Sequence, residues 1–222
     1  GWENEIPRST VYHINNGVDL EQFDYNTEHF RVDDPDLDDP NTFKVVYTGS
    51  IRKANGLGIL VDAAKAIRDP RIKILVWGEG DEREELTRRV MEEGLTNIVF
   101  KGQVEQKYVP SIVSRADLKL VHWGEVHLIQ YGVSYNKLFD YMAAGRPIFS
   151  TVRPGYSIWE KYDCGRDTED TRPEPLAHEL EKMAALPPEE LSRLGENARK
   201  VAEDYDFRVL TQKLLNVIGE IE

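Results

Sequence analysis

The chain has 222 residues and a mass of 25.5 kDa, which favours one large domain. Hydrophobic residues make up 40%, aromatic residues 9% and charged residues 31%, which excludes collagen-like, low-complexity and wholly disordered chains. The 28 Lys and Arg against 40 Asp and Glu give a net charge of −12, which disfavours nucleic acid and anionic lipid as partners. A local cationic pocket for a small phosphate ligand remains compatible with this charge.

The chain lacks the motifs of several enzyme and metal-site classes. The single cysteine, Cys164, excludes an internal disulfide and a thiolate metal cluster, and it favours a reducing compartment, so we expect a cytoplasmic protein. Neither Cys164 nor any serine lies in a G-x-S-x-G nucleophile turn, and we expect Cys164 to be buried. His122 and His127 are five residues apart, which suits no ordinary helical zinc site.

Nothing in the sequence indicates a targeting or membrane-spanning segment. No stretch approaches the roughly 18 apolar residues that a transmembrane helix needs. The first ten residues are polar and charged, unlike a signal peptide, and the missing initiator methionine predicts a fragment of a longer protein.

The first elements are short. Residues 11–14 form an apolar run that stops at Asn-Asn-Gly, which predicts a strand followed by a turn. Residues 33–42 are acidic and contain proline, which predicts a solvated loop or hinge. Their acids lack the spacing of a calcium loop, so we interpret them as solvated charge.

From residue 43, apolar strands alternate with amphipathic helices. Continuously apolar strands separated by helices are typical of a parallel sheet covered on both faces, so we predict a doubly wound, Rossmann-like α/β domain. The predicted strands are 43–48, 72–77, 97–101, 118–121 and 147–151, and the predicted helices are 57–68, 81–93, 107–115 and 135–144. The remainder from about 155 is predicted to be mostly helical, with one helix starting at Pro187-Pro188 and a last helix over 209–218.

In an open parallel sheet, ligands bind beyond the carboxyl ends of the strands. The first predicted strand is followed by Gly49 and Ser50, and then by Arg52 and Lys53, which can place positive charge on a phosphate. A flexible loop with two solvated cations is an equal alternative at this point. The second strand is followed by Gly78-Glu79-Gly80-Asp81, which lacks the third glycine of a dinucleotide turn, so we interpret Asp81 as a helix N-cap.

Residues 131–147 are the most informative segment. Asn136 and Asp140 lie four apart on one predicted helix face, with Lys137 beside them and Gly145 at the helix end. An ionised carboxylate one turn into such a helix can accept both hydroxyls of a vicinal diol. The alternative is that Lys137 and Asp140 make a surface ion pair worth under about 1 kcal/mol.

These motifs resemble glycosyltransferase family 4, and they follow the family's order over nearly the whole chain. The stretches that carry the resemblance are VYHINNGVDLEQF, YTGSIRKANGLGILVDA, GEGDEREEL, VFKGQV, NKLFDYMAAGRPI and PEELSRLGENARKVAEDYDFRVLTQKLL. The resemblance is closest to the branch that builds bacterial surface polysaccharides. It implies a GT-B fold of two Rossmann-like domains, of which residues 1–222 are the C-terminal, donor-binding one and the N-terminal acceptor domain is absent.

The resemblance also implies residue roles. Asp140 falls on the family's ribose-binding glutamate, the second of its Glu-x7-Glu motif. The first glutamate, which contacts the donor sugar, falls on Gly132, so Glu125 and Asn136 become the candidates near the sugar. Gly102, Gln103 and Val104 occupy the turn that contacts the base.

The resemblance is less regular at the diphosphate. The family's phosphate-binding Arg and Lys fall on Ser50 and Asn55, with Arg52 and Lys53 nearby to compensate. The predicted diphosphate-binding residues are Gly49, Ser50, Arg52, Lys53, Lys137, Leu138 and Phe139, the last two through their amides. Family members need no metal or other cofactor, because basic residues and helix N-termini stabilise the departing diphosphate.

The leading hypothesis is retaining transfer of a sugar from a nucleoside-diphosphate sugar, a UDP-sugar, to a glycan or lipid-linked acceptor in polysaccharide biosynthesis. We expect the isolated domain to be inactive and the full enzyme to be cytoplasmic, with peripheral association at the inner face of the membrane. A UDP-sugar 2-epimerase of the same architecture is one alternative. A non-catalytic domain with a decayed donor site, which Ser50, Asn55 and Gly132 permit, is another.

Overall fold

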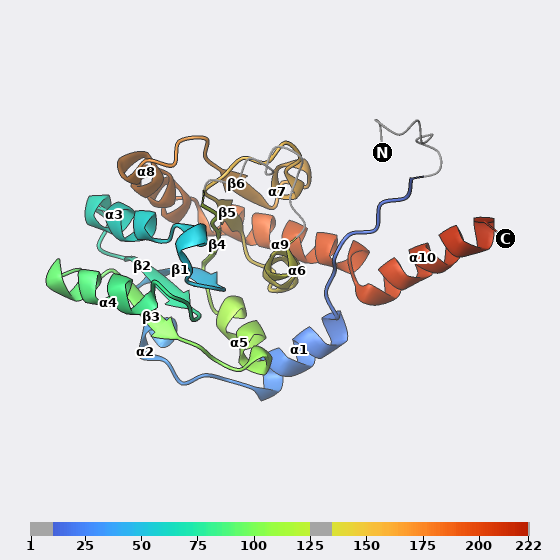
Figure 1. Ribbon diagram of the computed structural model, residues 1–222, viewed down its shortest axis with the longest axis horizontal. Coiled ribbons are helices and arrows are strands. Elements are labelled where there is room, and N and C mark those ends of the chain that lie inside the picture. Colours follow the sequence, from blue (N-terminus) through green and yellow to red (C-terminus); the bar gives the residue numbers. More distant parts are fainter. Residues whose placement is uncertain (1–10, 125–134, 222) are drawn as a thin grey trace.

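A computed structural model describes residues 11–124 and 135–221 of the chain (Figure 1). Its centre is a six-stranded, fully parallel sheet with the order β3-β2-β1-β4-β5-β6. The strands are β1 (Phe43–Thr48), β2 (Ile72–Trp77), β3 (Ile98–Gly102), β4 (Leu118–Val121), β5 (Ile148–Ser150) and β6 (Gly165–Asp167). This is the strand order of doubly wound dinucleotide-binding sheets, so the predicted fold class is confirmed.

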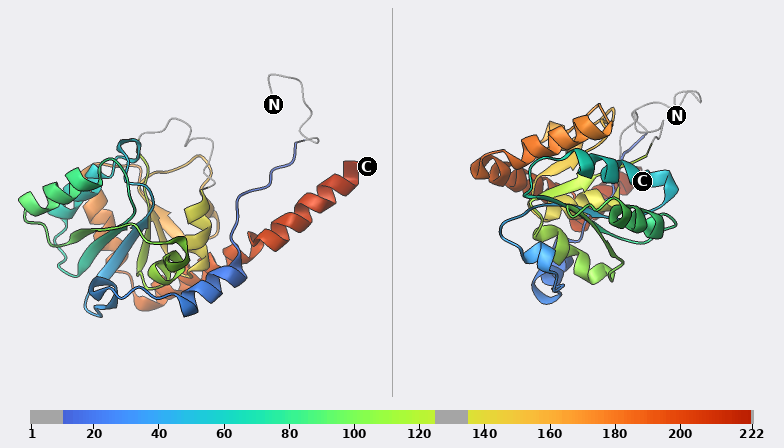
Figure 2. Two further views of the ribbon diagram at one scale, coloured as in Figure 1. Left: turned by 60° about the horizontal axis from the view of Figure 1, so that its bottom comes forward. Right: turned by 90° about the vertical axis from the view of Figure 1, so that its left-hand side faces the viewer.

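Helices cover both faces of the sheet (Figures 1 and 2). One face packs against α3 (Gly58–Ala66), α4 (Arg83–Glu92) and α8 (Pro173–Ala184). The other face packs against α1 (Leu20–His29), α5 (Val109–Ser114), α6 (Asn136–Ala143), α7 (Ile158–Lys161) and α9 (Pro188–Asp204). Because β1, β2 and β4 are buried on both faces, their sequences are almost continuously apolar.

Two predictions for the N-terminal region are wrong. Residues 11–14 form no strand; the chain first joins the sheet domain at Val18, whose N–H donates to the Tyr205 carbonyl at 3.0 Å. The acidic stretch contains a short helix, α2 (Pro35–Asp38), with Leu37 buried beneath it. The acids are not simply solvated, because lysines on β2 and β3 pair with them.

The pairing at α2 is tight. Asp34 and Asp36 both contact the ammonium of Lys101, at 2.8 Å for Asp34, and Asp36 also pairs with Lys73. Burial acts to raise the pKa of Asp36, but the hydrogen bonds from Lys101 and Lys73 prevail and hold it below its ordinary value. Sequence spacing could not reveal these partners, since they lie at least 37 residues away.

The C-terminal third is mostly helical, as predicted, but it also supplies the sixth strand. The sequence of β6, Gly165–Asp167, has no apolar pattern, so it does not resemble a strand. Gly165 is needed for its pairing with β5, because a Cβ there would lie 2.3 Å from the Ile148 carbonyl oxygen.

The last helix, α10 (Phe207–Ile221), projects from the body on the same side as residues 11–18 (Figure 2). These two segments carry most of the exposed large hydrophobic side chains of the described chain. They are Val11, Tyr12, Ile14, Phe207, Val209, Leu214, Leu215 and Ile218. None of the described helices combines the length and the apolar character that crossing a membrane requires.

Hydrogen bonds between Thr48 and Tyr141 help to join the end of β1 to α6. The Thr48 N–H donates to the hydroxyl of the fully buried Tyr141 at 2.8 Å. Tyr141→Phe removes this acceptor and leaves a buried N–H unsatisfied, so we expect it to lower the free energy of unfolding by about 1–3 kcal/mol. Urea denaturation measures this loss, with Tyr25→Phe, a change at a half-exposed ring, as the control. Equal stability of the two variants would contradict the expectation.

Candidate functional site

A crevice opens where β1 and β4 lie side by side, the point at which the strand order reverses. β1 pairs with β4 at Val45 and Val46, and beyond them the N–H of Thr48 is taken by Tyr141 instead. Two adjoining cavities of about 640 Å³ and 260 Å³ lie at this edge. They share Thr48, Gly49, Gln106 and Val109, so they form one continuous hollow beyond the carboxyl ends of the strands.

The larger cavity meets the N-terminus of α6. This helix has Tyr135 as its N-cap without a side-chain capping bond, and Tyr135, Asn136 and Lys137 line the cavity. The start of α6, where a helix presents N–H groups and a positive dipole, therefore lies at the cavity. Leu138 and Met142 are buried in the core, as the sequence pattern predicts. The helix ends at Gly145, which has φ +62°, also as predicted.

Lys137 supplies the positive charge. Of the described residues that line the two cavities, it is the only Lys or Arg. Its ammonium donates to the Tyr47 hydroxyl at 3.2 Å and lies 4.3 Å from the Tyr47 ring centroid and 5.1 Å from that of Trp123. Burial lowers the pKa of Lys137 to about 8, so the amine is still charged at neutral pH.

Asp140 lies one helical turn from Asn136, and both line the larger cavity. The Asp140 carboxylate forms no hydrogen bond or ion pair with any described residue, and burial raises its pKa to about 6. The alternative of a Lys137–Asp140 surface ion pair is therefore wrong for the described part of the chain. The site presents a cation and a carboxylate that are both desolvated and that have no oppositely charged partner among the described residues.

The glycine loop after β1 leaves room for the ammonium. A Cβ on Gly49 would lie 2.6 Å from the Lys137 nitrogen, and the φ of +149° at Gly49 is one that only glycine adopts readily. The loop is itself packed on Gly78, where a Cβ would lie 1.7 Å from the Gly49 carbonyl oxygen. Gly78 therefore serves close backbone packing and not a dinucleotide turn, which agrees with the sequence interpretation.

The smaller cavity holds the predicted base-contacting residues. Gln103 and Val104 line it together with Ser50 and Trp77. Gly102 lies immediately before them at the end of β3, and its carbonyl accepts from the Gly78 N–H at 2.9 Å.

Arg52 and Lys53 are not brought to either cavity. The chain turns away at the buried Ile51, whose N–H donates to the Glu79 carbonyl at 2.9 Å. The Lys53 N–H then donates to the Asp81 carboxylate at 3.2 Å. The prediction that Asp81 is the N-cap of α4 is wrong, because Glu82 occupies that position.

The remaining predicted site residues either have side chains buried in the core or lie outside the described residues. The side chains of Leu138 and Phe139 are buried in the core, and the Leu138 N–H already donates to the Tyr135 carbonyl at 3.0 Å. That contact competes with a diphosphate for the Leu138 amide, so the assignment of the Leu138 and Phe139 amides to the diphosphate stays a prediction. Glu125, His127 and Gly132 lie outside the described residues.

Sequence reasoning missed the aromatic residues of the site. Trp123 and Tyr135 line the larger cavity and stack with ring centroids 3.3 Å apart. The sequence analysis gives Tyr47 only a place in a strand and Val109 only a place in a helix, and it assigns Gln106 no role. The available signal is position, since Trp123 lies two residues after β4 and Tyr135 directly precedes α6.

His122 and Cys164 have structural surroundings. The His122 ring is buried, with Nδ1 2.7 Å from the Thr151 hydroxyl and Nε2 3.2 Å from the Gly56 carbonyl, so Nε2 carries the proton. Burial lowers the pKa of His122 to about 4 and raises that of Cys164 to about 12, which keeps both neutral. Among residues 11–124 and 135–221, no three His, Cys, Asp or Glu side chains are grouped to hold a metal.

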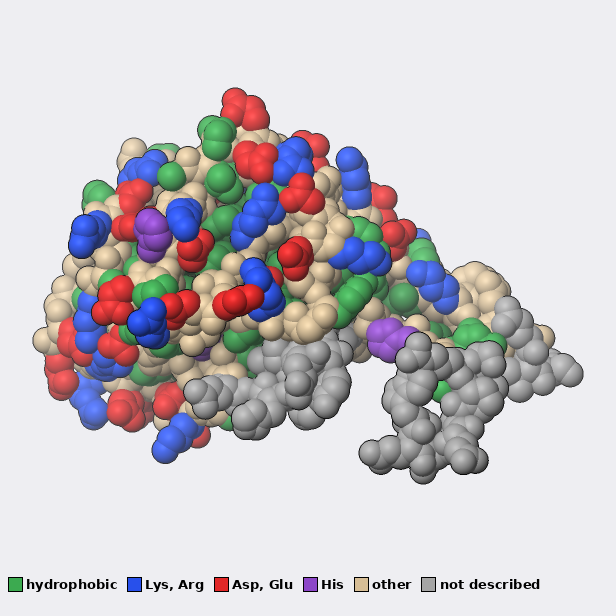
Figure 3. Space-filling view, turned by 90° about the horizontal axis from the view of Figure 1, so that it is seen from above, with side chains coloured by type: hydrophobic (Ala, Val, Ile, Leu, Met, Phe, Trp, Pro, Cys, Tyr) green, Lys and Arg blue, Asp and Glu red, His purple; other side chains and the backbone are tan. Residues whose placement is uncertain are grey.

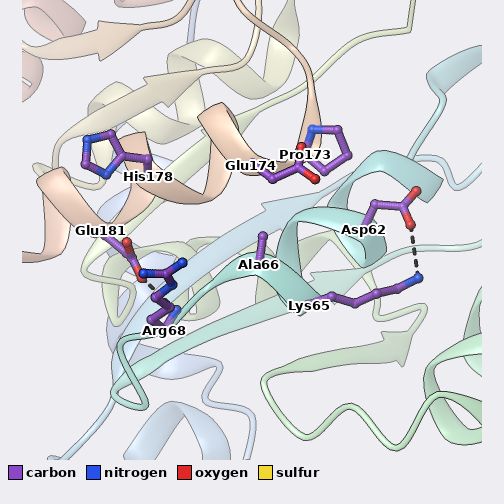
Figure 4. A pocket seen from close by; sticks show the side chains of 8 residues that line it. All are labelled: Asp62, Lys65, Ala66, Arg68, Pro173, Glu174, His178 and Glu181. Atoms are coloured by element: carbon purple, nitrogen blue, oxygen red, sulfur yellow. Dashed lines mark hydrogen bonds and ion pairs between the residues drawn. The ribbon is translucent and has the colours of Figure 1, made fainter.

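A second hollow lies between α3 and α8 and has a volume of about 790 Å³ (Figure 4). Some of its charged side chains already have partners: Lys65 contacts Asp62 at 3.2 Å, and Glu181 accepts the backbone N–H of Arg68 at 2.6 Å. On the face seen in Figure 3, acidic and basic side chains are interspersed without a patch of one sign. The crevice at β1 and β4 therefore remains the candidate site.

The family model of the glycosyl transferases group 1 matches residues 42–185, well over half of the chain. The chain belongs to this family. The match begins just before β1 and ends after α8, so it contains the whole sheet and the crevice.

The chain is also similar to individual proteins. It is 24% identical over 217 residues to TuaH of Bacillus subtilis (strain 168), which is named as a teichuronic acid biosynthesis glycosyltransferase. The aligned region covers 96% of this chain and 51% of TuaH. Anabaena HepE in complex with UDP-glucose is 16% identical with a TM-score of 0.72, over 99% of this chain and 60% of HepE. A Rickettsia africae glycosyltransferase is 15% identical with a TM-score of 0.77, over 98% of this chain and 59% of that one.

These likenesses confirm a fold shared with GT-B glycosyltransferases. This chain spans about half the length of TuaH and less than two thirds of the two solved structures.

Lys137 and Asp140 destabilise the free protein, because each is buried without an oppositely charged partner among the described residues. Because the folded-state pKa of Asp140 is raised from 3.8 to about 6, the penalty is complete above about pH 6 and disappears as pH falls toward 4. We expect Asp140→Asn to raise the free energy of unfolding at about pH 7.5 by on the order of 2 kcal/mol, and the gain to shrink at about pH 4. Urea denaturation at both pH values measures it; a variant less stable than the wild type at neutral pH would contradict this reading.

Proposed function

We propose that the chain is the donor-binding domain of a retaining glycosyltransferase that transfers a sugar from a UDP-sugar to a glycan or lipid-linked acceptor in polysaccharide biosynthesis. The observation that carries the proposal is the placement of Lys137 and Asp140. Both are desolvated, form no ion pair with a described residue, and lie on one helix that begins over the crevice of a doubly wound sheet. The anionic group of a ligand would neutralise Lys137, and a vicinal diol on the same ligand would hydrogen-bond to Asp140.

The diphosphate is assigned to Lys137, the N–H groups of the first turn of α6 and the backbone at Gly49. Negative charge builds on the diphosphate as the bond to the sugar breaks, and donors fixed in advance stabilise that charge without rearranging. In this proposal the protein's own groups do so, without a metal ion.

The nucleoside is assigned to Asp140 and the smaller cavity. The ionised Asp140 carboxylate accepts the two vicinal ribose hydroxyls, and the base enters the space lined by Gln103 and Val104. Asn136 and the segment that contains Glu125 and Gly132 are assigned to the surroundings of the donor sugar.

The comparisons support UDP as the nucleotide and polysaccharide synthesis as the setting. HepE structures hold UDP or UDP-glucose, and a TarM structure of S. aureus holds UDP. TuaH is named for teichuronic acid biosynthesis.

The acceptor is assigned to a second, N-terminal domain beyond residues 1–222. The relatives are longer than this chain, and α10 and residues 11–18 expose apolar side chains that such a domain could cover. We therefore propose that this chain alone binds the donor but transfers no sugar. The full enzyme is proposed to work in the cytoplasm, at the inner face of the membrane if its acceptor is lipid-linked.

The alternatives fit the site less well. A 2-epimerase needs acidic and histidine groups for proton transfer at the sugar, and of the described residues no histidine lines the cavities. A decayed donor site would not be expected to retain Lys137 and Asp140 at a cost in stability. Ser50 and Asn55 are neutral, but Lys137 supplies the charge that they lack.

We expect UDP to bind this domain and to raise its apparent stability by about 2.7 kcal/mol at a concentration of 100 Kd. Thermal-shift and titration calorimetry with UDP, GDP and ADP should show selectivity for UDP. Lys137→Met and Asp140→Asn should each weaken UDP binding at least tenfold, whereas Asp204→Asn, which lines neither cavity, should not. Undetectable nucleotide binding by the folded wild type at millimolar ligand would overturn the proposal.

The affinity for UDP-glucose should be greatest between about pH 6 and pH 8. Below about 6 the Asp140 carboxyl becomes protonated and loses an acceptor, and above about 8 Lys137 loses the charge that neutralises the diphosphate. UDP-glucose is the right probe because its diphosphate is a diester that does not titrate in this range. Calorimetry across the range measures the profile, and Asp140→Asn should remove the acidic limb only.

A further inference from the structure

The Tyr47 hydroxyl is saturated by three partners at the floor of the site. It donates to the Ser50 carbonyl at 3.2 Å and accepts from the Asn55 amide and from the Lys137 ammonium, each at 3.2 Å. The Asn55 amide also donates to the Ser50 carbonyl at 3.1 Å. A phenol offers one donor and two acceptor positions, so each has a defined partner.

The Lys137 ammonium forms no ion pair with any described residue, although Asp140 lines the same cavity and the buried, neutral His122 lies near enough to feel its charge. Its hydrogen-bond acceptor is the Tyr47 hydroxyl, and the rings of Tyr47 and Trp123 lie within the range of cation–π contacts. Gly49 keeps the space beside the ammonium open. This cage holds the ammonium in one place but leaves its charge available to a ligand.

We infer that Tyr47 is a positioning residue for Lys137. Asn55 fixes the Tyr47 hydroxyl, and the hydroxyl holds the Lys137 ammonium beside Gly49. There the ammonium, the one Lys or Arg cation among the described residues that line the cavities, binds the donor diphosphate. The inference rests on the proposed function. It also gives the neutral residues Ser50 and Asn55 a part in the site: they orient the phenol that orients the cation. The loop after β1 therefore contributes to anion binding although its own cations, Arg52 and Lys53, line neither cavity.

The test is the pH dependence of UDP-glucose affinity in Tyr47→Phe, measured by calorimetry. Loss of the hydroxyl removes an acceptor that favours the charged amine, so the affinity at neutral pH should fall about tenfold. The alkaline limb, which reflects deprotonation of Lys137, should also move to lower pH. A merely structural role of Tyr47 would lower affinity without moving that limb.

Tyr156→Phe is the matched control. The Tyr156 hydroxyl also contacts a lysine, Lys161 at 3.1 Å, but it lines neither cavity, so affinity and pH profile should match the wild type. Gly49→Ala is the second variant, since its methyl group would meet the ammonium, and it should weaken binding at least as much as Tyr47→Phe. Circular dichroism and urea denaturation confirm that each variant is folded.

The outcomes separate this inference from the proposed function. If the wild type binds UDP-glucose and Tyr47→Phe binds it equally well, or more weakly with an unmoved alkaline limb, the positioning role is wrong and the proposed function stands. If the folded wild type binds no nucleotide, the proposed function fails and this inference fails with it.

Discussion

The site depends on the divergence of β1 from β4. The two strands pair only up to Val46, and the Thr48 N–H that would otherwise continue the ladder donates to Tyr141 on α6. Together with the bond from Lys137 to Tyr47, this contact joins α6 to the end of β1, so the helix lies at the carboxyl edge of the sheet. The ammonium of Lys137, the carboxylate of Asp140 and the glycine loop meet there as a result.

The same arrangement buries the charged groups of Lys137 and Asp140, which lowers the stability of the fold. Burial opposes ionisation of both Lys137 and Asp140, and neither finds an opposite charge among the described residues. Elsewhere several half-buried charges are paired, as Lys101 with Asp34 shows, but the fully buried Lys119 ammonium also has no hydrogen-bond partner among the described residues. Lys137 and Asp140 differ from Lys119 because they line a cavity. Desolvated charges in a cleft are typical of functional sites, where a ligand can supply the missing partners.

Much of this could be predicted from the sequence. The strands 43–48, 72–77 and 118–121 were predicted at the residues where they occur, because strands buried on both faces leave a continuous apolar run. Asp140, Lys137 and Asn136 were placed on one helix from their spacing, and that helix does line the cavity.

The rest depends on contacts between residues distant in sequence. β6 has too few residues to show a hydrophobic pattern. The helix α2 is held by lysines on β2 and β3, which are distant from it in sequence. Arg52 and Lys53 looked suited to a phosphate, but the packing of Ile51 and Gly78 turns them away. The role of Tyr47 is visible only when the loop after β1 and the start of α6 are seen together.

The most direct test is the titration of the Asp140 carboxyl by carbon-13 NMR, assigned with Asp140→Asn, in the free protein and with UDP bound. The account predicts a pKa of about 6 in the free protein, because the carboxylate is desolvated and unpaired. It predicts a lower pKa with UDP, because the ribose hydroxyls then hydrogen-bond the charged form. A pKa near 3.8 in the free protein, or one that UDP leaves unchanged, would contradict it.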